Sequence, residues 1–176
     1  MFHRVVIAVG CILLLAGCQQ TTPGDTPGAL IAPSSLAMKA VDVPFSGGVT
    51  GQVDFSTTHC APAFTAVITA AGPFTHMGLS TWTSRHCVAM GQVTQGDLQL
   101  TAANGDTLHV TYTGTCASAP IGQPIVCTGP AVILPGTGRF EHASGTATFR
   151  GTVTNLGMNV AIWPGSWELL DGSIRY

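Results

Sequence analysis

From residue 41 onward the chain contains short stretches in which apolar and polar residues alternate. In residues 108–113, Leu108, Val110 and Tyr112 fall on one side of an extended strand, and the residues between them are polar. This period of two predicts a half-buried β-strand with an apolar face toward a core.

Residues 146–154 alternate more regularly. Ala147, Phe149, Gly151 and Val153 share one face, and threonines with one arginine occupy the other. The C-terminal residues 167–176 also alternate, but their phase shifts near Leu169 and Leu170, which predicts a β-bulge there.

Turn signals separate these strand candidates. Between residues 98–101 and 108–113 stands Asn104-Gly105, a hairpin signal because both residues tolerate positive φ. No amphipathic helix of useful length appears, so seven to nine short, mostly antiparallel strands predict a sandwich or a barrel. The frequent strand glycines, which permit sharp bending, favour a barrel of about eight strands over residues 41–176.

The chain begins with a different pattern. Met-Phe-His-Arg is short and positive, and residues 5–15 are an uninterrupted apolar run, too short to span a bilayer core of about 20 residues. Leu15-Ala16-Gly17-Cys18 then resembles the lipobox of bacterial lipoproteins. The resemblance implies that residues 1–17 are a cleaved signal peptide and that Cys18 carries lipid, with a further acyl chain such as palmitate on its amino group.

Residues 18–40 are expected to be a tether after the lipidated cysteine. Proline and glycine alternate there with small polar residues and no period, which predicts a loose coil spanning about 25 Å on average. Gln19 follows the cysteine where an inner-membrane retention signal would carry aspartate. By resemblance to Gram-negative lipoprotein sorting, we expect an outer-membrane lipoprotein that faces the periplasm.

Charge is sparse and narrows the function classes. After residue 17 the chain has eight acidic residues against five basic ones, Lys39, Arg85, Arg139, Arg150 and Arg175. With no basic patch, binding to nucleic acid is disfavoured. No P-loop, dinucleotide fingerprint or serine hydrolase motif occurs, so we predict no cofactor and no catalytic residue.

Four further cysteines form an even set in an oxidising compartment, so two disulfides are expected. Three connectivities exist, and we favour Cys116–Cys127, which closes a short loop, with Cys60–Cys87. The alternative is a zinc site built from His59-Cys60 and His86-Cys87, but their spacing lacks the usual C-x₂₋₄-C, and we predict no metal.

Residues 136–149, with a glycine-rich turn, a short aromatic-bearing segment and a following strand, resemble part of allene oxide cyclase-like and dirigent-like barrels. Together with residues 72–81, they also resemble bacterial secreted proteins of that barrel type. The resemblance covers about residues 41–176. It implies an eight-stranded barrel with a cavity, often a homo-oligomer. Catalytic residues of either family cannot be placed on this chain by motif, and the two cysteine pairs depart from the plant members.

The cavity of such a barrel is expected to involve His76, Trp82 and Tyr112. A structural role in a turn or strand is the competing interpretation of His76, and core packing that of Trp82. The favoured function is a membrane-anchored, non-enzymatic barrel that binds a small apolar ligand or an envelope component. The alternatives are a cyclase- or isomerase-like enzyme with His76 as its acid–base group, and a structural or interaction module.

Overall fold

Eight antiparallel strands close into one barrel in sequence order, which confirms the prediction of a small all-β barrel. The computed structural model describes residues 41–176; the signal segment, Cys18 and the tether lie outside the described residues. Within that range no helix is both long and apolar enough to cross a membrane. The strands are β1 (Val43–Asp54), β2 (Phe64–Phe74), β3 (Gly78–Ala89), β4 (Gln92–Ala102), β5 (Thr107–Cys116), β6 (Pro124–Leu134), β7 (Ser144–Thr154) and β8 (Ile162–Arg175).

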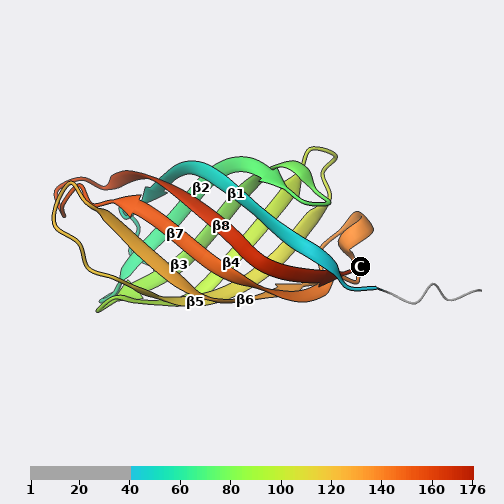
Figure 1. Cartoon of the computed structure of the whole chain (residues 1–176). Helices are drawn as coiled ribbons and strands as arrows, with labels where there is room; N and C mark the ends of the chain where they lie inside the picture. Colours follow the sequence, from blue (N-terminus) through green and yellow to red (C-terminus); the bar gives the residue numbers. More distant parts are fainter. Residues whose placement is uncertain (1–40) are drawn as a thin grey trace, which may run out of the picture. The chain divides into compact units, whose positions relative to one another are not determined.

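Each strand pairs with the next, and β1 pairs with β8 to complete the closure. The β1–β8 register runs from Val43 opposite Ile174 to Asp54 opposite Ile162. Figure 1 shows the strands tilted around the barrel, with the first strand lying beside the last. Because each of the eight strands between residues 43 and 175 has two partners, this part of the chain has no sheet edge left to pair with another chain.

The alternation of apolar and polar residues along each strand determines which side chains face the barrel interior and which face outward. Leu108, Val110 and Tyr112 of β5 are buried, as are Ala147 and Phe149 of β7, which confirms the predicted faces. The outward positions of the same strands carry mainly threonine, which suits an exposed β surface.

Bulges adjust this pattern at two places. β8 has one extra residue between Leu169 and Gly172 opposite β1, and between Leu170 and Ser173 opposite β7. Asp171, which lies in both intervals, takes a φ of 50°, and this confirms the predicted bulge. A second bulge in β4 places Gln95 at a φ of 53°. Each bulge restores the inward direction of the apolar residues that follow it.

The Asn104-Gly105 hairpin also forms, but with a different turn from the expected one. Gly105 donates its backbone N–H to the carbonyl of Ala102, and Gly105 has positive φ while Asn104 does not. The connection is therefore a β-turn closed by one left-handed glycine, rather than a turn with two left-handed residues.

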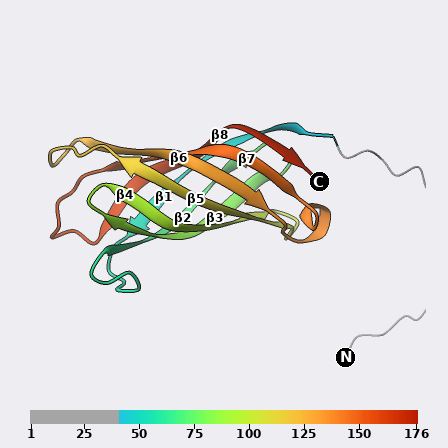
Figure 2. The ribbon, with the colours of Figure 1, turned by 90° about the horizontal axis from the view of Figure 1, so that it is seen from below.

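One end of the barrel is closed by its own chain. The connection between β6 and β7 contains a short 3-10 helix, η1 (Gly138–Phe140), which inserts Phe140 into the core with no exposed surface. Met77 and Ala143 are buried at the same end. The chain also enters β1 and leaves β8 there, as Figures 1 and 2 show.

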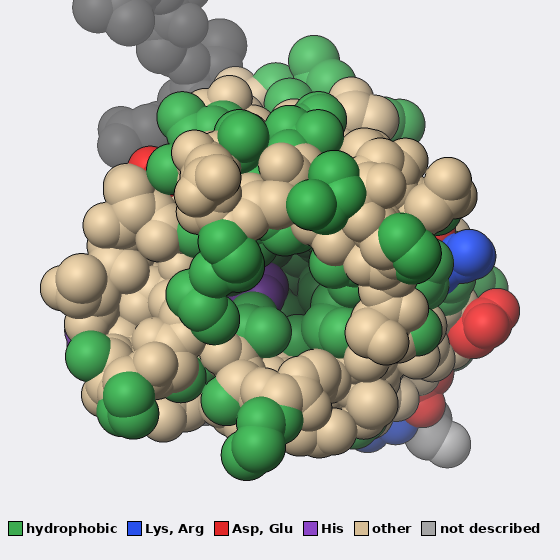
Figure 3. Space-filling view, turned by 90° about the vertical axis from the view of Figure 1, so that its left-hand side faces the viewer, with side chains coloured by type: hydrophobic (Ala, Val, Ile, Leu, Met, Phe, Trp, Pro, Cys, Tyr) green, Lys and Arg blue, Asp and Glu red, His purple; other side chains and the backbone are tan. Residues whose placement is uncertain are grey.

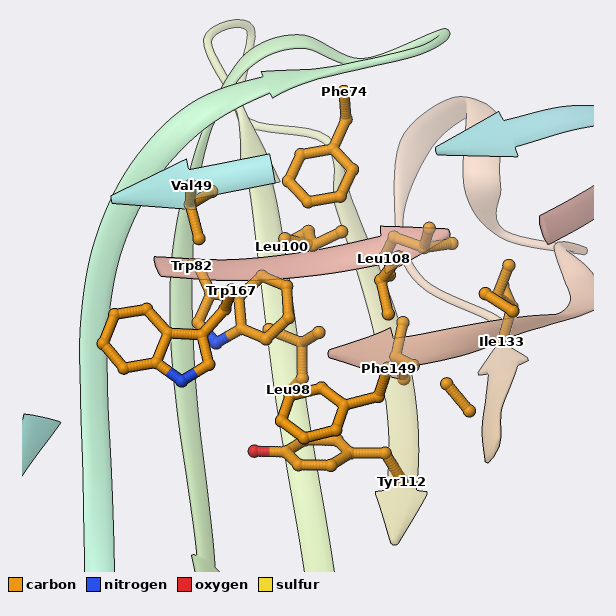
Figure 4. Packing of buried hydrophobic residues seen from close by; sticks show 14 of the residues in the cluster. Val49, Phe74, Trp82, Leu98, Leu100, Leu108, Tyr112, Ile133, Phe149 and Trp167 are labelled. Carbon is orange, nitrogen blue, oxygen red and sulfur yellow. The ribbon is translucent and has the colours of Figure 1, made fainter. Parts of the chain in front are cut away.

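Large side chains fill the half of the barrel next to this closed end. Figure 4 shows them meeting at the centre, with the ring of Tyr112 stacked on that of Phe149 at a centroid distance of 4.3 Å. The largest fully buried residues are Trp82, Trp167, Phe45, Phe140, Phe149, Ile68, Leu98, Leu100, Leu108, Ile133, Leu169 and Ile174. This half is packed as a protein core is and leaves the other half to hold any cavity.

Candidate functional site

The opposite end of the barrel opens into a cavity of about 550 Å³. We call the four connections around it the mouth loops: residues 55–63, 90–91, 117–123 and 155–161. Figure 3 looks into this end and shows a hollow lined by hydrophobic side chains. The volume falls within the range of roughly 300–1,000 Å³ typical of small-molecule sites.

Inward residues near the mouth line the cavity. Along β7 the inward positions pass from Phe149 to Gly151 and Val153, and the Trp167 ring packs against Gly151, where an added Cβ would lie 2.9 Å from it. Ala66 of β2 and Val93 of β4 face the same space. The rings of Phe149 and Trp167 form part of its floor, where the packed half of the barrel begins.

The mouth loops contain no Asp, Glu, Lys or Arg, although Asp54, the last residue of β1, adjoins one of them. Met90, Ile121, Met158 and Val160 are exposed there. The closed end differs, because Arg175 bonds both carboxylate oxygens of Asp42 at 3.0 Å.

His86 is the ionisable side chain that lines the cavity formed by residues 41–176. It lies on β3 in the inward series Ser80, Trp82, Ser84 and His86, and only 7% of its surface is exposed. A histidine is visible inside the hollow in Figure 3, and His86 is the histidine of the lining. Burial lowers the pKa of His86 from 6.5 to about 4, so the imidazole is neutral at physiological pH.

A chain of buried hydrogen bonds holds His86 from beneath. Nδ1 of His86 lies 2.8 Å from the hydroxyl of Tyr112, which donates to Oγ of Ser84 at 3.2 Å. The indole N–H of Trp82 donates to the same Oγ at 2.8 Å. Burial also raises the pKa of Tyr112 well above its usual range, so the phenol stays protonated.

The space for Tyr112 depends on a glycine of the neighbouring strand. Gly96 of β4 pairs with Tyr112 of β5, and a Cβ at Gly96 would come within 2.6 Å of the phenol ring. The ring therefore fits between Gly96 and Phe149, which fixes the direction of its hydroxyl toward His86.

Both disulfides form with the predicted pairing. Cys60 is bonded to Cys87, and Cys116 is bonded to Cys127, a directly opposed pair on β5 and β6. The zinc alternative loses its thiolates, and no group of three or more His, Cys, Asp or Glu side chains in the described range could hold a metal ion. His59 is exposed on a mouth loop, whereas His86 faces inward.

The three residues expected at the cavity lie elsewhere than in its lining. His76 is exposed at a φ of 63° in the turn between β2 and β3, at the closed end, where its Nε2–H donates to the carbonyl of Pro44 at 2.9 Å. This hydrogen bond agrees with the competing, structural interpretation of His76. Trp82 and Tyr112 are buried beneath the cavity, and they contact it through Ser84 and His86.

The sequence suggests a role for His86 only as a zinc ligand beside Cys87. The inward position of His86 could have been inferred from residues 78–89. If Trp82 faces the core, every second residue of the strand does so too, which places Ser84 and His86 on the inward face. A histidine that faces the interior of a barrel needs either a buried partner or a cavity, and His86 has both.

The chain matches no protein-family model, no curated protein and no solved structure.

Proposed function

We propose that this protein is a lipid-anchored protein of the cell envelope whose barrel binds a small apolar ligand. The observation that carries the proposal is the apolar cavity at the mouth, which lies next to a fully packed core. A barrel that served only as a structural module would have no need of a hollow half, since filling it would stabilise the fold.

The position of the chain entry supports a binding role for an anchored protein. β1 begins at the closed end, so the attachment through residues 18–40 leaves from the end opposite the mouth. A ligand can therefore enter the mouth without passing the point of attachment. Lipidation of Cys18 and an outer-membrane location facing the periplasm stay predictions from the sequence.

Binding is favoured over acid–base catalysis by the state of His86. A group whose conjugate acid has a pKa of about 4 is a weak base at neutral pH, below the range in which general bases are effective. Its Nδ1 is also engaged by Tyr112. The cyclase-like alternative would need a stronger base than this histidine provides.

A dye titration with one blocking variant tests the proposal. N-phenylnaphthylamine, an uncharged dye that brightens in apolar surroundings, should bind saturably to the full chain. Val153→Trp places an indole in the cavity wall and should weaken binding at least tenfold, while Thr148→Trp, on the outward face of the same strand, should not. Equal binding by both variants would show that the dye binds outside the cavity and would contradict the proposal.

A further inference from the structure

One side-chain nitrogen at the cavity, Nε2 of His86, can bind a ligand. Nε2 of His86 has no hydrogen-bond partner among residues 41–176, yet every fully buried side-chain nitrogen and oxygen there has one. Nε2 is therefore accessible from the cavity that His86 lines. A polar atom in such a place directs which ligands fit an otherwise apolar site.

We propose that the cavity selects an uncharged apolar molecule with one hydrogen-bond donor, such as an alcohol, and that Nε2 of His86 accepts this hydrogen bond. The proposal rests on the apolar-ligand function proposed above and specifies the chemical class of the ligand.

The hydrogen-bond chain beneath the cavity sets the direction of this contact. Tyr112 has one hydroxyl proton, and it donates that proton to Oγ of Ser84. Toward His86 the phenol oxygen can therefore only accept, so Nδ1 carries the imidazole proton. A neutral imidazole with its proton on Nδ1 presents a lone pair at Nε2. The free atom is an acceptor, and its complement is a donor.

The neutral state of the His86 imidazole also favours Nε2 as a hydrogen-bond acceptor. Burial lowers the pKa of His86 to about 4, so the doubly protonated ring, which would donate from Nε2, is scarce near neutral pH. Trp82 donates its indole N–H to the same Oγ of Ser84, so this oxygen accepts from both the indole and the phenol.

The surroundings exclude an ionised ligand. No Asp, Glu, Lys or Arg side chain belongs to the lining that the described residues form, and the mouth loops contain none. A charged group brought into this cavity would lose its hydration without gaining a counter-charge, which is strongly unfavourable. The polar end of the ligand is therefore neutral.

Calorimetric titration with three matched probes tests the ligand class. Decanol, its methyl ether and decanoate differ only at the polar end, and the full chain carrying Cys18→Ser is used so that no detergent competes for them. Decanol should bind roughly 5- to 10-fold more tightly than the ether, the effect of one hydrogen bond. Decanoate should bind more weakly than either. His86→Phe should abolish the preference for decanol, whereas His142→Phe, at an exposed position, should retain it.

NMR of the protein that retains His86 provides a second test, which does not depend on the His86→Phe variant folding correctly. Nitrogen chemical shifts of His86 should report the proton on Nδ1, and decanol should shift the Nε2 signal. A proton on Nε2, or equal affinities for decanol and its ether, would overturn the donor proposal while leaving the apolar-ligand function standing. If neither probe bound at all, the proposed function would fail and this inference with it.

Discussion

The Nδ1 atom of His86, a residue that lines the apolar cavity, lies 2.8 Å from the hydroxyl oxygen of Tyr112 beneath it. The two side chains come from β3 and β5, which do not pair with each other, so their contact crosses the interior of the barrel. Their contact links the packed half of the barrel to the hollow half.

Replacing Tyr112 by Phe should destabilise the barrel by about 1–3 kcal/mol, because the Nδ1–H of His86 would lose its buried acceptor. Urea unfolding followed by tryptophan fluorescence would measure the loss. Tyr176→Phe is the matched control, since Tyr176 is exposed at the C-terminus and should change stability little. Equal effects of the two substitutions would contradict the role given to the Tyr112 hydroxyl.

Stability should fall as the pH is lowered from about 6.5 to about 4. The pKa of His86 is lowered in the folded protein, so over this range the unfolded chain takes up a proton that the folded chain does not. The loss should approach about 3 kcal/mol near pH 4. Unfolding measured at several pH values would test it.

The same pH series identifies the group responsible. His86→Gln should flatten the dependence between pH 6.5 and 4, while His142→Gln, an exposed histidine on the β6–β7 connection, should leave it intact. A slope that persists in His86→Gln would assign the effect to other groups.

Much of the fold could be predicted from the sequence because inward and outward residues alternate with little interruption. Leu108, Val110 and Tyr112 are buried as expected, and the phase shift at Leu169 marks a real bulge. The disulfide pairing also followed from short loop closure and compartment. These features depend on local pattern, which a single sequence contains.

The cavity could not be predicted in the same way. Its lining brings together Ala66, Val93 and Gly151 from three different strands, and these residues meet only when the barrel closes. His76 is expected near a cavity because it lies in a segment that resembles bacterial barrels of this type, but the β2–β3 turn places it at the closed end. Which end of the barrel a loop occupies depends on the number of strands before it, and the sequence pattern predicts only a range of seven to nine strands.

The two disulfides should contribute unequally to stability. Cys60–Cys87 joins residues 27 apart and Cys116–Cys127 joins residues 11 apart. If a disulfide acts by lowering the entropy of the unfolded chain, replacing Cys116 and Cys127 by serine should lower the free energy of unfolding by about 3 kcal/mol. Replacing Cys60 and Cys87 should lower it by roughly 1 kcal/mol more. Urea unfolding of the two double variants would measure both. A larger loss for the Cys116–Cys127 variant would show that the bond acts mainly on the folded barrel.

Cys18→Ser should release the protein from the membrane. The lipobox-like sequence before Cys18 predicts that this thiol carries the lipid, and acyl chains stabilise membrane attachment by about 0.8 kcal/mol for each buried CH₂. Fractionation of the wild-type and variant proteins would check it. A Cys18→Ser protein that still sediments with membranes would contradict the anchor prediction, although the barrel itself would be unaffected.

Native mass spectrometry of the protein taken from its own membranes tests the central claim most directly. The account predicts a bound, uncharged small molecule on the unsubstituted protein and on Thr148→Trp, and its loss from Val153→Trp, in which the cavity is filled. A protein that carries no small molecule and takes up none of the apolar probes, with or without the filled cavity, would contradict it.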